Sequence, residues 1–67
     1  MMLTNHWYTV QQILLTIPED DIIFVDGLSF TRKELNEEFN DIRLRYYRSE
    51  TINNQTHHMF TMCPAHI

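Results

Sequence analysis

The residues best suited to chemistry are histidines and a cysteine near the end of the sequence. His57, His58, Cys63 and His66 all belong to the residue types that bind zinc and other transition metals. His57 and His58 are adjacent, so an extended chain would point them to opposite faces, away from a common ion. The sequence also lacks the second, well-separated ligand pair of a zinc finger. We therefore predict no bound metal or cofactor, and keep a metal-stapled domain ligated by His58, Cys63 and His66 as an alternative.

Cys63 is also the one candidate nucleophile, and the nearby histidines are candidate bases for it. A reactive cysteine needs a preorganised pocket around it, because its thiolate has to be stabilised there. A chain of 67 residues has little volume in which to form such a pocket. We therefore predict that the protein is not an enzyme and that it has no catalytic residues.

Length and composition predict one small domain over residues 1–67. A single cysteine rules out a disulfide within the chain and fits a reducing compartment, so we expect a cytoplasmic protein. No run approaches the roughly 20 apolar residues of a membrane span. Domains this small often depend on a partner subunit for stability, and we therefore expect a homo-oligomer.

The net charge of −4 argues against non-specific binding to nucleic acid, which depends on neutralising phosphates with Lys and Arg. The basic residues are concentrated between Arg32 and Arg48. If that segment is a helix, its first turns carry the acids, whereas DNA-reading helices place their N-terminal turns against the groove. Nucleic acid is therefore not the expected partner.

Two segments share the pattern of a helix start. Tyr8-Thr9-Val10-Gln11-Gln12-Ile13 and Phe30-Thr31-Arg32-Lys33-Glu34-Leu35 each contain a capping threonine, a Gln or Glu three residues later, and a flanking hydrophobic staple. We therefore predict helices that begin after Thr9 and Thr31. The first should run to about Ile17, because Pro18 disfavours helical geometry in the residue before it.

Between the two helices the sequence predicts a β-hairpin. Ile22–Val25 is a β-branched and aromatic run, and Leu28–Phe30 is the returning strand. Asp26-Gly27 is a strong signal for the tight turn that joins them, because that turn requires positive φ. Residues 3–8 are a further possible short strand.

The second helix is predicted to extend from Arg32 to about Ser49. Leu35, Phe39, Ile42 and Tyr46 follow a helical spacing and would form its buried stripe. Residues 51–56 are predicted to be a polar linker to a C-terminal tail, in which residues 57–63 could add a strand to the hairpin edge or to a second copy. The expected fold class is α+β: a short helix, a β-hairpin, then a long amphipathic helix.

The polar face of that long helix provides the predicted contact residues. Its acids are either an ordinary solvated surface or a patch that docks on a basic partner. Leu44 and Tyr47 lie outside its buried stripe, within the segment Arg43–Arg48, whose Arg and Tyr residues are typical of interfaces. The predicted partner-binding residues are Glu34, Glu37, Glu38, Asp41, Leu44 and Tyr47.

The expected function is that of a non-enzymatic protein-binding module that covers a surface on a larger host protein. In size and composition the chain is similar to small accessory and inhibitor proteins encoded by viruses and mobile elements. The alternative is a dimeric, DNA-associated transcriptional regulator that uses the segment Arg43–Arg48. These hypotheses differ in salt dependence, because only the second relies on phosphate contacts.

Overall fold

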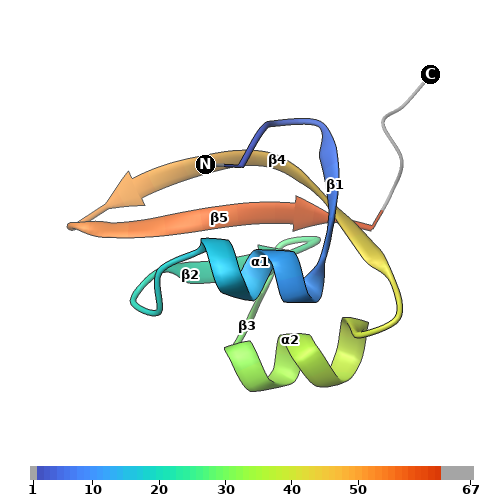
Figure 1. The fold of residues 1–67 in the computed structure, drawn as a ribbon. Helices are drawn as coiled ribbons and strands as arrows, with labels where there is room; N and C mark the ends of the chain where they lie inside the picture. The colour runs from blue at the N-terminus through green and yellow to red at the C-terminus, as the bar shows by residue number, and fades with distance from the viewer. Residues whose placement is uncertain (1, 63–67) are drawn as a thin grey trace.

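The structure is a computed structural model that describes residues 2–62. Two short helices lie against a five-stranded mixed sheet (Figure 1). The elements in chain order are β1 (His6–Thr9), α1 (Val10–Thr16), β2 (Ile22–Val25), β3 (Leu28–Phe30), α2 (Arg32–Phe39), β4 (Arg43–Ile52) and β5 (Gln55–Thr61). The predicted plan of a short helix, a hairpin and a long helix is therefore wrong.

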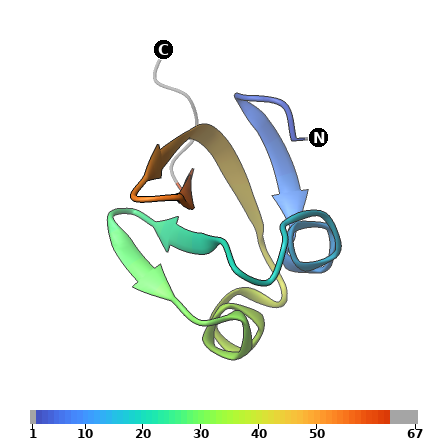
Figure 2. The same cartoon turned by 90° about the vertical axis from the view of Figure 1, so that its left-hand side faces the viewer.

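The sheet has the strand order β1-β4-β5-β2-β3, so the last of the described strands occupies its centre. β5 runs antiparallel to β4 and parallel to β2, and the two outer pairs are antiparallel. The end-on view in Figure 2 shows both helices on one side of this sheet. β1 and β3 are the edge strands.

Both predicted helix starts are confirmed, and each is held by a complete capping box. In the first box, the Thr9 hydroxyl accepts from the backbone N–H of Gln12, and the Gln12 side chain accepts from the backbone N–H of Thr9. In the second box, Thr31 and Glu34 make the same two hydrogen bonds. α1 ends at Thr16, directly before Ile17 and Pro18.

Arg32 joins the two helices. Its guanidinium donates to the backbone carbonyl oxygens of Leu14 and of Ile17, the latter at 3.2 Å. These carbonyls lie at the C-terminal end of α1, where intrahelical partners run out. A basic residue at this position also complements the helix dipole. The first residue of α2 therefore caps the end of α1.

The predicted hairpin is confirmed. Asp26 and Gly27 have φ values of 51° and 85°, the left-handed geometry that the tight turn requires. β2 and β3 pair on either side of it, with Val25 opposite Leu28.

The largest correction concerns the long helix. α2 ends at Phe39, and residues 43–52 form β4 instead. Arg43-Leu44-Arg45-Tyr46 alternates polar and apolar residues, which is the pattern of a half-buried strand. Leu44 and Tyr46 both enter the core in this geometry, whereas a helix would have left Leu44 outside. Burying both side chains outweighs the weaker helical pattern.

The predicted linker over residues 51–56 is also wrong. Residues 51 and 52 end β4, Asn53 and Asn54 form a turn with φ values of 53° and 65°, and Gln55 begins β5. Asparagine tolerates this left-handed geometry better than most residues. β5 does pair with the hairpin, one of the two predicted alternatives, although it ends at Thr61, and Cys63 lies outside the described residues.

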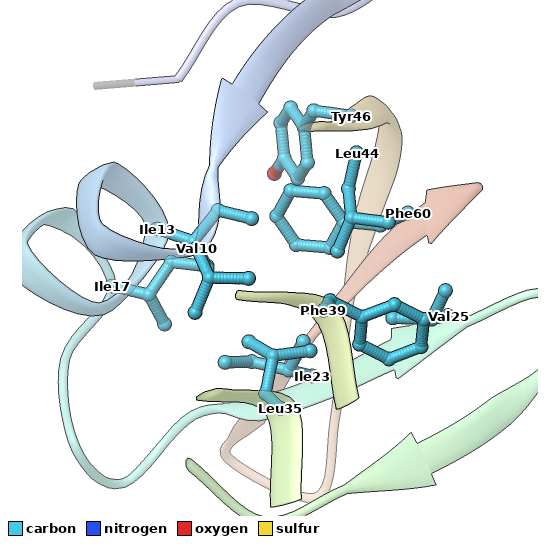
Figure 3. Packing of buried hydrophobic residues seen from close by; sticks show 10 residues of the cluster. All are labelled: Val10, Ile13, Ile17, Ile23, Val25, Leu35, Phe39, Leu44, Tyr46 and Phe60. Atoms are coloured by element: carbon cyan, nitrogen blue, oxygen red, sulfur yellow. The ribbon is translucent and has the colours of Figure 1, made fainter. Parts of the chain in front are cut away.

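The core lies between the helices and the face of the sheet that they cover (Figure 3). Alternate residues of β2, β4 and β5 meet the apolar sides of α1 and α2, including the end of α1. The core residues are Val10, Ile13, Ile17, Ile23, Val25, Leu35, Phe39, Leu44, Tyr46 and Phe60. The other residues of these strands consequently point to the opposite face of the sheet.

Candidate functional site

The face of the sheet that the helices leave uncovered is the first candidate site. Strand register arranges its side chains in three rows across the sheet, and we call these rows together with Arg43 the open face. The rows are Trp7–Arg45–Thr61, Arg48–Met59–Phe24–Ser29 and Glu50–His57–Ile22. Arg43 joins them because it precedes Arg45 by two positions in the same strand.

Charge is unevenly divided between this face and the rest of the molecule. The chain has five basic residues, and three of them, Arg43, Arg45 and Arg48, lie on β4. Within the three rows Glu50 is the one acidic residue, and its carboxylate lies 3.6 Å from the guanidinium of Arg48. Arg45 donates to the side-chain oxygen of Asn5 at 2.9 Å. The open face therefore carries three arginines beside Glu50 and beside Asp26, whose carboxylate accepts from the Thr61 hydroxyl at 2.6 Å. It is less acidic than the protein as a whole, whose net charge is −4.

Aromatic and apolar groups lie among these arginines. Trp7 is 39% exposed, and Tyr47 next to the open face is 38% exposed. Tyr47 is the extra residue of a β-bulge between Tyr46 and Arg48. A bulge of this kind re-aims the side chain that it carries. The ring centroids of Phe24 and His57, both on the open face, are 5.4 Å apart.

The predicted acidic contact residues lie elsewhere, on and after α2. Glu37 and Glu38 are exposed on the helix, and Asp41 is exposed in the loop that follows. Glu34 is exposed too, but its carboxylate accepts from the Thr31 amide in the capping box. These four acids remain a predicted docking surface, on the helical layer and apart from the arginines of β4.

The structure separates the two apolar residues that were predicted to contact a partner. Leu44 is 0% exposed, because β4 turns it into the core, so the surface position expected for it is wrong. Tyr47 is at the surface, as expected, through the bulge and not through a helix. The sequence reasoning missed Trp7, whose exposure follows from its place on an edge strand.

A second candidate site surrounds His58, on the covered side of the sheet. Its Nε2 lies 2.7 Å from a side-chain oxygen of Asp21, and its Nδ1 lies 3.1 Å from the hydroxyl of Tyr46. The side chains of His58 and Asp21 are 14% and 18% exposed. Three segments far apart in the sequence thus form one chain of hydrogen bonds, which we call the His58 relay.

A cavity of about 340 Å³ opens beside this relay. Its wall combines the N-terminal segment, the end of α1, β4 and β5. The lining residues are Met2, Thr4, Thr16, Ile17, Pro18, Tyr46, Ser49 and His58. No sequence spacing predicts this arrangement, because strand pairing alone brings residues 21, 46 and 58 together.

The structure describes only one of the three residues of the predicted alternative metal site. His58 is engaged by Asp21 and Tyr46, and Cys63 and His66 lie outside the described residues. His57 and His58 point to opposite faces of β5, as predicted, since one ring contacts Phe24 and the other contacts Tyr46. Over residues 2–62, no group of three or more His, Cys, Asp or Glu side chains is placed to hold a metal ion.

Sequence and structure comparisons add no relative. No family model matches the chain, and comparisons with curated proteins and with solved structures gave no match. Among the described residues, no helix has both the length and the apolar character needed to cross a bilayer. The geometry of the two candidate sites is therefore the basis for a functional proposal.

Proposed function

We propose that this protein is a non-enzymatic protein-binding module that docks through the open face of its sheet. The observation that supports this most directly is the combination of Trp7 and Tyr47 with three arginines of β4 at the sheet face that the two helices do not cover. Trp, Tyr and Arg are the residues most enriched among the energetic hot spots of protein interfaces.

An ordinary solvated sheet face has a different composition. The exposed side of an antiparallel sheet usually carries polar residues in alternation with the core residues. Here Ile22, Phe24 and Met59 occupy those alternate positions at the centre of the sheet, each partly buried by its neighbours. Covering them with a partner would remove further apolar surface from water, which favours association.

The partner surface should carry carboxylates next to apolar groups. Arginine forms two parallel hydrogen bonds with a carboxylate, and its flat guanidinium also packs on apolar surface. The acids of α2 lie on the helical layer, on the other side of the sheet from the open face. Exposed charges separated by more than the Debye length, about 8 Å at physiological salt, are largely screened from one another.

A protein fits this face better than a nucleic acid does. Binding to nucleic acid gains mainly from the counterions that each phosphate contact releases. Among the described residues, this face offers three arginines, Arg43, Arg45 and Arg48; Arg45 already donates to Asn5, and Glu50 lies against Arg48. The resemblance in size to accessory and inhibitor proteins of viruses and mobile elements fits a cytoplasmic role in which this face covers a host protein.

The test compares two matched variants in affinity capture from candidate host lysates. Trp7→Ala and Arg43→Glu alter the open face at exposed positions, and Glu37→Gln is the control on the helical layer. The proposal expects a protein that the wild type and Glu37→Gln retain and that both open-face variants lose. Reversal of an acidic residue on that protein should then restore its binding to Arg43→Glu.

Two results would overturn the assignment. A partner lost only with Glu37→Gln would move the interface to the acids of α2, as the sequence pattern predicted. Salt-sensitive binding of a single-stranded oligonucleotide, abolished in Trp7→Ala, would instead assign the open face to nucleic acid, because bases stack on exposed aromatic rings.

A further inference from the structure

The His58 relay has a definite hydrogen-bond direction when the imidazole is neutral. A carboxylate can only accept, so the Nε2 of His58 must carry the proton that is donated to Asp21. Its Nδ1 is then an acceptor, and the hydroxyl of Tyr46 donates to it. The proton of that hydroxyl is thereby engaged, and its oxygen can still accept a further hydrogen bond.

The cavity beside the relay suits a small uncharged molecule. Its volume of about 340 Å³ is at the lower end of the range for ligand pockets, roughly 300–1,000 Å³. Met2, Ile17 and Pro18 supply apolar surface, and the lining residues within the described range 2–62 include no Lys, Arg, Asp or Glu. The hydroxyls of Thr4, Thr16 and Ser49 add polar groups without charge.

We infer that this cavity binds a small neutral molecule with an apolar body and a hydroxyl group that donates a hydrogen bond to the oxygen of Tyr46. Asp21 fixes the tautomer of His58, and His58 in turn fixes Tyr46 as an acceptor. The relay is thus a recognition element. This site is separate from the open face, because its residues line the side of the sheet that the helices cover.

Three probes that share one carbon skeleton separate the contributions of the ligand's hydrogen-bond donor, its acceptor and its apolar body. 1-Phenylethanol can donate and accept, acetophenone can only accept, and ethylbenzene can do neither. Titration is followed by the backbone amide NMR signals of Thr16 and Ser49 at about pH 8, where histidine is ordinarily neutral. We expect 1-phenylethanol to bind about five-fold more tightly than the other two, the usual worth of one net hydrogen bond.

The variant Tyr46→Phe should abolish that difference, and Tyr47→Phe is its matched control, because Tyr47 lies outside the cavity lining. If Tyr46→Phe fails to fold, the relative affinities of the three probes for the wild type still test the inference.

Equal affinity of the three probes for the wild type would overturn the inference, as would signal changes confined to the open face. An alcohol preference that persists in Tyr46→Phe would reject the role of the relay. None of these outcomes bears on the open-face proposal, which uses other residues and other probes.

Discussion

The two faces of the sheet are made by the same strands yet differ in nearly every property. In β5, Phe60 is fully buried under the helices while its neighbour Met59 lies on the open face. In β4, Leu44 is fully buried and the flanking Arg43 is exposed. The covered face carries most of the packing that stabilises the fold, whereas the open face includes exposed side chains, such as Trp7 and Arg43, that contribute less to it. Substitutions at adjacent positions can therefore separate stability from binding.

The largest effect is expected for Phe60→Ala. Its ring is 0% exposed and packs on Tyr46 at 5.1 Å between ring centroids, so truncation leaves a cavity at the centre of the core. We expect a loss of about 4 kcal/mol in the free energy of unfolding. That loss is comparable to the whole stability of a small domain, so the variant should be largely unfolded.

Met59→Ala is the matched control for this comparison, one residue earlier in the same strand. It should lose less than about 1 kcal/mol, because its side chain is only partly buried on the open face. Urea unfolding followed by circular dichroism measures both variants. Similar losses for the two would contradict the division of labour between the faces.

The adjacent histidines extend the comparison at intermediate magnitude. His58→Ala removes the partner of both Asp21 and Tyr46, and we expect a loss of about 2 kcal/mol. His57→Ala removes only a ring contact with Phe24, and about 0.5 kcal/mol is expected. Thermal unfolding at neutral pH compares the two, and a larger effect at His57 would refute the structural importance of the relay.

The helix caps give the next smaller effect. Thr9→Ala and Thr31→Ala each remove one side-chain acceptor from a capping box, for a loss of about 1 kcal/mol. Because both helices cover the same face, the two losses should both reduce global stability. Thr9→Ser and Thr31→Ser retain the hydroxyl and should remain near wild type by chemical denaturation.

A small effect on stability is expected at Trp7→Ala. Trp7 is 39% exposed on an edge strand, so the fold should lose less than about 1 kcal/mol. Its partner affinity should nevertheless fall at least ten-fold if Trp7 is a hot spot of the interface. Isothermal titration with the captured partner provides the measurement. If Trp7→Ala were strongly destabilised and still bound the partner, Trp7 would contribute to the fold and not to the interface.

The sequence predicted the parts of this fold that are determined locally. The capping boxes at Thr9 and Thr31 and the Asp26-Gly27 turn involve residues within three positions of one another, and all are present. β4 was misassigned because Leu35, Phe39, Ile42 and Tyr46 satisfy a helical spacing, although Ile42 is 42% exposed. Only the tertiary burial of Leu44 beside Phe60 decides between strand and helix there.

The candidate sites show the same difference between features determined locally and features determined by long-range contacts. Tyr47 was identified from the composition of its segment, and it is exposed. The contact between residues 21 and 58 spans 37 positions and depends on the parallel pairing of β2 with β5. Such a crossover pairing leaves no periodic trace in the sequence, so neither the relay nor the three rows of the open face could be assembled from it.

The central position of β5 has a consequence for how the chain is made. A ribosome delivers β1, α1, β2, β3, α2 and β4 before the strand that joins the two halves of the sheet. Until Gln55–Thr61 emerges, β4 and β2 each expose an unpaired edge, a common starting point for aggregation. A chain whose translation stopped before Gln55 would lack the strand that joins β4 to β2 and would keep both of these edges unpaired.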